Sequence, residues 1–289
     1  MKENGKITKE QYDQAVATPV TDGLIAHDNN VNSNDKALVY DSFVTMVLKE
    51  VQEKTGLDPY NDGLTIETTI DSKAQQRLYD IVNTNDYIQY VNEKIQNAVV
   101  MLDTKTGAVR AVNGGRKQTT LLGYNRATDN TRSTGSTIKP VIDYGPAIEY
   151  LNYSTGQTIM DQRTTYSNGV ELNNWDFSHK GAMTLRTALV YSRNTTALQT
   201  FKAVGETNIK SFLNNLDIQI KNDGQDYLVE SNSIGADISP IKMAAAYATF
   251  GNYGNYSKPY TVTKVTTRDG QVTEFKPEQK QAMKDSTAY

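Results

Sequence analysis

Apolar residues recur every three or four positions in several stretches of the chain, and this spacing is typical of amphipathic helices. One long stretch, ALVYDSFVTMVLKEVQEKT, predicts a helix over residues 37–55. The stretch from 183 to 205 predicts a helix, or a helix pair broken near 192–195, that ends at Gly205. Further helices are expected at residues 7–15, 73–83, 136–147, 209–216 and 238–254.

Other stretches alternate apolar and polar residues, as half-buried strands do. Alternation predicts a strand over residues 63–71 and a hairpin whose strands, 97–103 and 108–114, are joined by Thr-Lys-Thr-Gly. A second hairpin is expected over 259–275, turning at Asp269-Gly270. Helices mixed with antiparallel hairpins favour the α+β class, with one antiparallel sheet covered by helices.

Between the first two helical patterns, residues 19–36 are polar, rich in Asn and weakly periodic, which predicts a linker or a long surface loop. At the other end, Asp285 and Ser286 are expected to cap a helix that has barely begun. Because both ends fall in ordered-looking sequence, we expect the chain to be a piece of a longer protein.

Charge and composition exclude several function classes. A net charge of −3 and scattered Lys and Arg residues argue against nucleic acid as a partner. The chain has no cysteine and two histidines, so we expect no disulfide, no metal site and no cofactor. No apolar run is long enough to span a bilayer, so an anchor would have to lie outside this chain.

Candidate chemistry comes from the pattern Ser-x-x-Lys, which occurs three times. We expect the first occurrence to be a solvated part of the 19–36 loop. The third precedes a helix with proline at its first position, so its serine is expected to act only as an N-cap. The three pairs are Ser33 with Lys36, Ser136 with Lys139, and Ser239 with Lys242.

The middle pair differs because Pro140 is tolerated only in the opening turn of a helix, which must therefore begin close to Ser136. Free N–H groups at a helix start can stabilise an oxyanion, and Lys139 lies on the same helical face as the serine. A lysine in a buried or cation-rich site can act as a base without histidine. The alternative is an ordinary N-cap followed by a solvated lysine.

A second element favours the catalytic interpretation. Ser192-Arg193-Asn194 is the only Ser-x-Asn of the chain, and it interrupts a helical pattern in which Ser and Asn are poor choices. Ser-x-x-Lys followed by Ser-x-Asn resembles the active-site elements of penicillin-binding proteins and serine β-lactamases. The resemblance continues through VVMLDTKTGAVRAVNGG, GYNRATDNTRSTGSTIKPVIDYGPAIEY, GAMTLRTALVYSRNTTALQTF and SPIKMAAAYATFGNYG.

Residues 63–289 thus resemble the transpeptidase domain of a class A, bifunctional penicillin-binding protein of the Gram-positive type. Residues 1–62 look like the tail of that family's glycosyltransferase domain and the inter-domain linker. The resemblance implies the serine β-lactamase and DD-peptidase fold, which would be incomplete in this chain. It also implies a location at the extracytoplasmic face of the bacterial plasma membrane, with an anchor outside the chain.

The resemblance also implies roles for individual residues. Ser136 would be the nucleophile, with its backbone N–H forming half of the oxyanion hole, and Lys139 would be its base. Ser192 would relay a proton, and Asn194 would bind the amide of the substrate. Trp175 lies in NNWDF, which matches a family stretch near the entrance of the cleft; it either contacts ligand or packs in the core.

The third element of the family is Lys-Thr-Gly on a strand downstream of the other two. The only Lys-Thr-Gly here is Lys105-Thr106-Gly107, upstream of both, and we interpret it as an ordinary hairpin turn. We expect the true element beyond Tyr289. Either a second chain, a C-terminal fragment of the same protein, supplies it, or this chain is not competent alone.

The function implied is a penicillin-sensitive D-Ala-D-Ala transpeptidase that cross-links peptidoglycan stem peptides and is acylated by β-lactams. Three alternatives stay open at this point. One is a β-lactamase or DD-carboxypeptidase of the same fold, although no convincing Glu-containing loop for deacylation is present. Another is a non-catalytic peptidoglycan-binding module, and the third is a structural surface domain.

Overall fold

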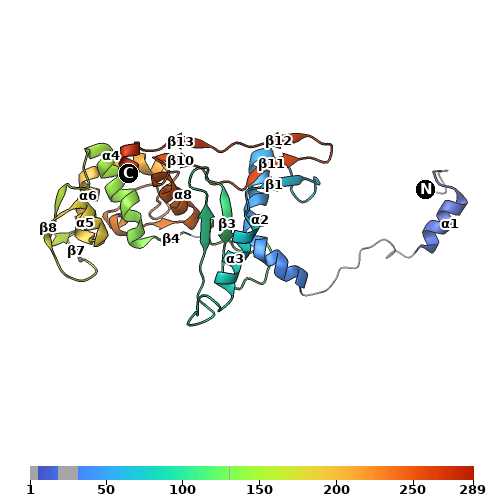
Figure 1. The fold of residues 1–289 in the computed structure, drawn as a ribbon, viewed down its shortest axis with the longest axis horizontal. Coiled ribbons are helices and arrows are strands. Elements are labelled where there is room, and N and C mark those ends of the chain that lie inside the picture. Colours follow the sequence, from blue (N-terminus) through green and yellow to red (C-terminus); the bar gives the residue numbers. More distant parts are fainter. Residues whose placement is uncertain (1–5, 19–31, 130) are drawn as a thin grey trace. The chain divides into compact units, whose positions relative to one another are not determined.

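The structure, a computed structural model, describes residues 6–18, 32–129 and 131–289, without the side chains of 32–35. Two compact units divide at residues 37 and 38, and each is considered by itself. In the first, α1 (Lys9–Ala17) confirms the predicted N-terminal helix (Figure 1). The helix begins with a capping box, in which the Thr8 side chain accepts from the N–H of Gln11 and the Gln11 side chain accepts from the N–H of Thr8.

The division between the units falls inside α2 (Asn32–Thr55), which starts earlier than expected. The prediction that Ser33 and Lys36 lie in a loop is therefore wrong, because residues 32–36 are helical. Once the amphipathic part of α2 has formed, each polar residue added at its end forms one more helical hydrogen bond. The free-energy cost of nucleating a helix does not have to be met again. The rest of the predicted linker, residues 19–31, lies outside the described residues.

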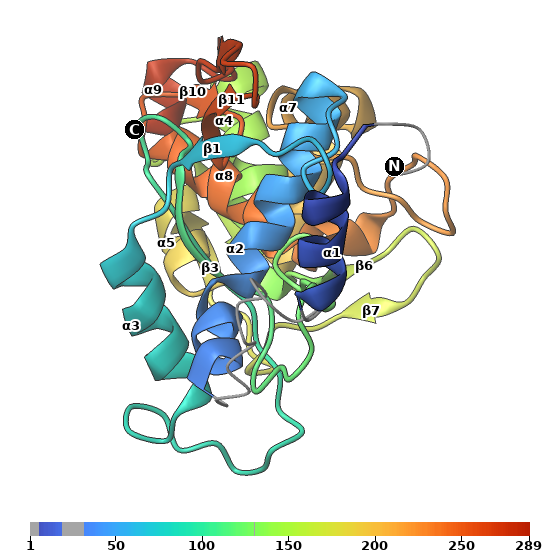
Figure 2. The same ribbon diagram turned by 90° about the vertical axis from the view of Figure 1, so that its right-hand side faces the viewer.

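Within the second unit, α2 packs against antiparallel strands. Phe43, Val47 and Val51 on the helix contact apolar residues of the strands to form one core. A glutamine of the neighbouring helix α3, Gln75, donates to the carbonyls of Val39 and Val112, and so ties α3 to α2 and to β3. Both views show α3 beside α2 (Figures 1 and 2). The elements are β1 (Thr65–Thr68), α3 (Ser72–Asn83), β2 (Val99–Leu102), β3 (Val109–Asn113), β11 (Val262–Thr266) and β12 (Val272–Glu274).

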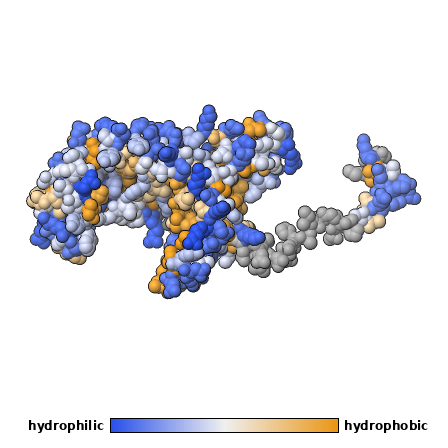
Figure 3. Space-filling view, in the orientation of Figure 1, coloured by the Kyte–Doolittle hydropathy of each residue, from blue (hydrophilic) through white to orange (hydrophobic). Residues whose placement is uncertain are grey.

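Both predicted hairpins are confirmed. β2 pairs with β3 across the turn that contains Lys105, and β11 pairs with β12 across Asp269-Gly270. Gly270 has a φ of +86°, a conformation that glycine adopts without strain. Hydrophobic side chains are visible around the β2–β3 hairpin in the space-filling view (Figure 3).

The strands confirm the α+β class, but the described residues place them in several short antiparallel ladders rather than one continuous sheet. The segments that precede β3 and β11 meet at an isolated parallel bridge between Ala108 and Tyr260, which is too short to form a ladder. Other ladders pair β4 (Arg132–Ser133) with β9 (Asp237–Ile238), β5 (Thr158–Asp161) with β8 (Gly181–Thr184), β6 (Thr164–Thr165) with β7 (Glu171–Leu172), and β10 (Asn255–Ser257) with β13 (Gln279–Gln281).

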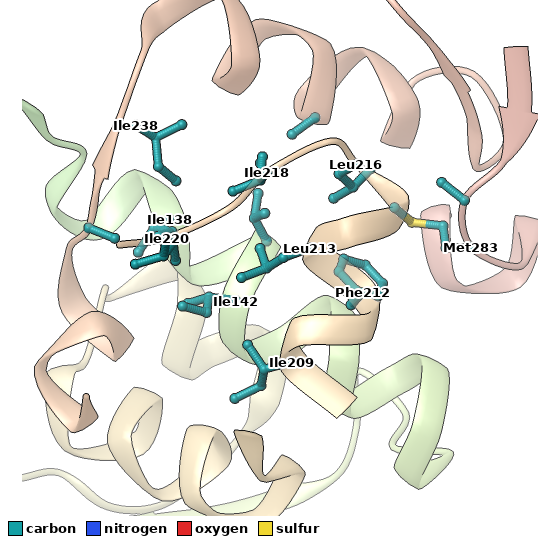
Figure 4. Packing of buried hydrophobic residues seen from close by; sticks show 14 of the residues in the cluster. Ile138, Ile142, Ile209, Phe212, Leu213, Leu216, Ile218, Ile220, Ile238 and Met283 are labelled. Carbon is teal, nitrogen blue, oxygen red and sulfur yellow. The ribbon is translucent and has the colours of Figure 1, made fainter. Parts of the chain in front are cut away.

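A second core is enclosed by helices. Ile138 and Ile142 from one helical segment meet Phe212, Leu213 and Leu216 from another, as the close-up shows (Figure 4). α8 packs against β2 and β10, which connects this core to the strands. The helices are α4 (Gly145–Leu151), α5 (Leu185–Val190), α6 (Asn194–Val204), α7 (Glu206–Asn215), α8 (Pro240–Phe250) and α9 (Asp285–Ala288).

The predicted helix over 183–205 is a pair, α5 and α6, and its interruption near 192 is confirmed. Ser239 is confirmed as the N-cap residue of α8, with Pro240 at the first helical position, although the Ser239 side chain makes no capping hydrogen bond. The other capping prediction is wrong. Asp285 and Ser286 lie inside α9, and Lys284 is the N-cap residue.

Candidate active site

Ser136 lies near the start of a helical segment, as Pro140 predicted. The segment begins with a 3-10 turn (η1, Gly135–Ile138), passes through a π-helical turn (η2, Pro140–Tyr144) and continues as α4. In the π turn, the Gly145 N–H donates to the carbonyl of Pro140, five residues back. Pro140 is the first residue of the π turn, where the spacing of the backbone hydrogen bonds changes. Its missing N–H therefore interrupts no regular α-helical hydrogen-bond pattern.

The two residues of the pair lie in opposite environments. Ser136 is exposed at the surface, whereas the side chain of Lys139 is completely buried. Among the described residues, no hydrogen bond joins the Ser136 hydroxyl to Lys139 or to any other group. Hydrogen bonds between a nucleophile and its base often form only when substrate is bound. The absence of this hydrogen bond is therefore compatible with Ser136 and Lys139 acting as a catalytic pair.

The amine of Lys139 brings together three of the predicted site residues. Its Nζ lies 2.8 Å from the carbonyl oxygen of Ser192, 3.2 Å from Ser192 Oγ and 2.8 Å from Asn194 Oδ1. These three acceptors match the three protons of an ammonium group. The Ser-x-Asn element therefore faces the lysine of the Ser-x-x-Lys element.

Burial disfavours the charged form of Lys139 and lowers the pKa of its amine to about 8. The carboxyl of Asp143 opposes this change, and the positive charge of Arg193 adds to it. A measurable fraction of the amine is therefore neutral near pH 7 and able to accept a proton. This property distinguishes Lys139 from a solvated first-turn lysine.

The backbone at Ser192 explains how one residue offers two acceptors to the lysine. Ser192 has a φ of +50°, a left-handed conformation that is uncommon for a residue other than glycine. It follows the end of α5 and lies two residues before the first residue of α6. Non-glycine residues in this conformation persist where the surroundings hold them, and they cluster at functional sites.

Those surroundings include a buried charge network that the sequence did not reveal. Arg193, completely buried, donates from Nε to Asp161 at 2.8 Å and from Nη1 to both oxygens of Asp176 at 2.9 Å. Asp161 also accepts from the hydroxyl of Thr195 at 2.6 Å. Arg193, the residue between Ser192 and Asn194, is thus held by Asp161 and by Asp176.

The start of α6 is capped from another segment. The Oδ1 of Asn174 accepts from the N–H of Asn194 at 2.7 Å and from that of Thr195 at 3.3 Å. Its amide nitrogen donates to Asp161 at 2.7 Å. Asn174 stands next to Trp175, so the match of NNWDF to a family stretch was the one sequence signal that could have found it.

Trp175 is not a core residue, because 67% of its surface is exposed. Its indole N–H donates to the carbonyl of Tyr191 at 3.0 Å, which places it beside the residue that precedes Ser192. The core-packing interpretation is therefore wrong. A contact between Trp175 and ligand stays a prediction.

Lys105-Thr106-Gly107 forms the turn of the β2–β3 hairpin, as expected, and Lys105 is exposed. Asp103 organises the turn by accepting from the N–H groups of Lys105 and Thr106.

Among the described residues, no group of three or more His, Asp or Glu side chains is placed to hold a metal ion. None of the described helices has both the length and the apolar character needed to cross a membrane.

Comparison with known proteins places this geometry in context. The family model "Penicillin binding protein transpeptidase domain" matches residues 97–289. Over its whole length the chain is 39% identical to penicillin-binding protein 1A/1B of Bacillus subtilis and 39% identical to penicillin-binding protein 1A of Streptococcus oralis. It spans 31% and 46% of the lengths of these relatives.

Solved structures share the fold. The penicillin-binding protein PonA1 of Mycobacterium tuberculosis superposes with a TM-score of 0.73 at 23% identity, over 88% of this chain and 67% of that chain. Penicillin-binding protein 1A of Haemophilus influenzae superposes with a TM-score of 0.65 at 20% identity, over 96% of this chain and 54% of that chain.

Proposed function

We propose that this chain carries a serine D-Ala-D-Ala transpeptidase site. The chain belongs to the penicillin-binding protein transpeptidase domain family and has class A relatives in Gram-positive bacteria. The enzyme cross-links peptidoglycan stem peptides and is inhibited by penicillins. The observation that supports this proposal most is the buried amine of Lys139, which contacts both polar residues of Ser-x-Asn. Family membership supports the serine acyl-transfer chemistry.

In the first half of the reaction, Ser136 Oγ attacks the carbonyl carbon between the two terminal D-alanines. The hydroxyl proton passes to the neutral amine of Lys139, and backbone N–H groups at the helix start stabilise the oxyanion. When the C–N bond breaks, the departing D-alanine amine receives a proton from the Lys139 ammonium through the hydroxyl of Ser192. The product is an ester between the peptide and Ser136.

In the second half, an amine of a neighbouring stem peptide attacks this ester. Lys139 takes the proton of the amine and returns one to Ser136 Oγ as the C–O bond breaks. The Asn194 amide binds the peptide amide of the substrate, and exposed Trp175 contacts the ligand at the rim of the site. A β-lactam acylates Ser136 by the same first step, with its ring nitrogen as the leaving group.

Names of solved relatives support sensitivity to β-lactams. One structure is of PonA1 in complex with penicillin V, and another, of penicillin-binding protein A from M. tuberculosis, is an imipenem acyl-enzyme complex. These complexes belong to those proteins. For this chain, they support the proposal that a penicillin forms a covalent adduct.

We further propose that a C-terminal fragment of the same protein carries the Lys-Thr-Gly strand. The open edge of β2 supports this: among the described strands β2 pairs with β3 alone, and Val99 and Met101 are exposed on it. An unpaired edge with apolar residues is suited to accept another strand.

A domain boundary between residues 62 and 63, with the transpeptidase domain after it, stays part of the proposal. In the structure, residues 38–62 belong to the same compact unit as residues 63–289.

The proposed location is the extracytoplasmic face of the bacterial plasma membrane, where peptidoglycan is assembled, with the anchor in a segment outside this chain. The curated relatives are longer than the chain, which is consistent with a further segment in the parent protein. Fractionation of cells that produce the parent protein should place it in the membrane fraction, open to protease added from outside. Recovery in the cytosol would contradict this location.

The test of function is the intact mass of each polypeptide of the assembled protein before and after addition of benzylpenicillin. We expect this chain to gain the mass of one penicillin, and a companion polypeptide with the Lys-Thr-Gly strand to remain unmodified. A donor peptide ending in D-Ala-D-Ala, incubated with an acceptor amine, should yield D-alanine and a cross-linked product.

Other outcomes identify the alternatives. Rapid turnover of a chromogenic β-lactam without a persistent adduct indicates a β-lactamase, and D-alanine release to water without cross-linking indicates a carboxypeptidase. Peptidoglycan binding with neither adduct nor D-alanine release indicates a non-catalytic module. Each of these results contradicts the proposed transpeptidase.

A further inference from the structure

Asp143 is a buried carboxyl that the proposed reaction does not use. It lies in the π turn η2, its side chain is 0% exposed, and neither carboxyl oxygen has a hydrogen-bond partner among the described residues. A carboxylate buried without hydrogen bonds is costly unless another charge compensates it. When it is ionised, Asp143 therefore requires a charge partner within the protein.

Lys139 has the complementary need. All three contacts of its amine are with uncharged oxygens of Ser192 and Asn194. Among the described residues, no carboxylate forms an ion pair with it at 4 Å or less. A buried ammonium with only neutral neighbours is also unstable without a nearby negative charge.

The two groups are arranged to compensate each other. Asp143 follows Lys139 by four residues, about one helical turn, and residues with this spacing are neighbours on one side of a helix. Because water is excluded from both, their attraction is weakened less over distance than it would be at the surface. Burial raises the pKa of Asp143 well above its usual value, and the charge of Lys139 opposes that rise.

The other buried charges near the pair are already matched. Arg193, which repels the Lys139 ammonium, pairs with Asp161 and Asp176. The hydroxyl of Tyr144 is uncharged and lies 3.2 Å from that of Thr196. The charged groups on the helices packed against η2 also have partners: Glu149 with Lys284, Lys202 with Glu230, and Glu206 with Lys210.

We propose that Asp143 is a positioning residue that acts through Lys139, as the internal counter-charge of its ammonium, and so sets the pH at which the lysine loses its proton. The catalytic consequence rests on the proposed function. When Lys139 accepts the proton of Ser136, Asp143 stabilises the charge that forms. Without Asp143 the amine is a weaker base, and it is neutral over a wider pH range.

The direct test follows the ¹³Cε chemical shift of Lys139 against pH in the assembled protein, with the signal assigned by its absence in Lys139→Met. In Asp143→Asn we expect the titration midpoint to move to lower pH by about one unit or more. Tyr144→Phe is the matched control, because it changes the next buried residue without removing a charge, and its midpoint should stay that of the unmodified protein. Asp143→Leu, also uncharged, is the second variant if the asparagine variant does not fold.

The same variants should differ in the pH profile of penicillin acylation. The rising limb of the acylation rate should move to lower pH in Asp143→Asn, by the same amount as the chemical-shift midpoint, and not in Tyr144→Phe. An unchanged Lys139 midpoint in Asp143→Asn overturns the proposal. If the unmodified protein forms no adduct, the proposed function fails, but the chemical-shift titration still decides the role of Asp143.

Discussion

The Ser-x-x-Lys segments at Ser136 and at Ser239 both lie at the start of helices, and the serine and the lysine have opposite burial in the two. At the first, Ser136 is exposed and Lys139 is completely buried. At the second, Ser239 is 3% exposed and Lys242 is exposed. A nucleophile must be reached by its substrate, and a lysine base must be desolvated to lose its proton. Sequence spacing is shared by both segments, but only the first has the environment that the chemistry needs.

The largest difference between the two segments should appear when each serine is replaced. Ser136→Ala should abolish the covalent penicillin adduct, because the variant has no oxygen to form the ester. Ser239→Ala should form the adduct at an unchanged rate, measured by intact mass over time. An adduct that persists in Ser136→Ala, with the same yield, would remove Ser136 from its proposed role.

Replacing the lysines should give the next largest effect. Lys139→Met keeps most of the buried volume but removes the base, so the acylation rate should fall by about 10²- to 10⁴-fold. Lys242→Met changes only a solvated side chain, and its rate should stay within about twofold. The second-order rate constant with a fluorescent penicillin is the measurement; equal rates in the two variants would contradict a role for Lys139.

Stability should reveal the network that holds Ser192 and Asn194 opposite Lys139. Asp161→Asn leaves the buried Arg193 without one of its partners and should lower the free energy of unfolding by about 3–5 kcal/mol. The control is Glu171→Gln, which removes the exposed pair with Arg163 and should cost less than about 1 kcal/mol. Urea denaturation measures the free energy of unfolding of both variants. Similar decreases in the two variants would show that the buried network stabilises the protein no more than an exposed ion pair does.

A smaller and graded effect is expected from pH. Because burial lowers the pKa of Lys139 to about 8, and only the neutral amine accepts the serine proton, acylation should accelerate as pH rises. The rate should increase about tenfold per pH unit well below 8 and level off above it. A profile that is flat from pH 6 to 9, measured where the protein stays folded, would exclude Lys139 as the titrating base.

The part of this site that could be predicted came from local rules. Pro140 restricts where a helix can begin, so the position of Ser136 followed from sequence. The poor helix formers Ser192 and Asn194 marked the break between α5 and α6. Chain resemblance then supplied the roles that spacing alone could not decide among three Ser-x-x-Lys pairs.

What could not be predicted depends on contacts between distant segments. Asn174 caps α6 from 20 residues away, and Asp161 binds Arg193 from 32 residues away, without any periodic pattern to announce either contact. Burial of Asp143 is equally invisible, because its position in the chain suits a solvated helix face as well. The early start of α2 was missed since polar residues extend a helix once a neighbouring apolar stretch has formed it.

The most direct test of the proposal that Ser136 is the nucleophile of this site is to locate the adduct by tryptic peptide mass mapping after benzylpenicillin treatment. Cleavage separates the two segments: residues 133–163 contain Ser136, and residues 222–242 contain Ser239. We expect one penicillin on peptide 133–163, with fragment ions that place it on Ser136. An adduct on peptide 222–242, or on another serine of the first peptide, would contradict it.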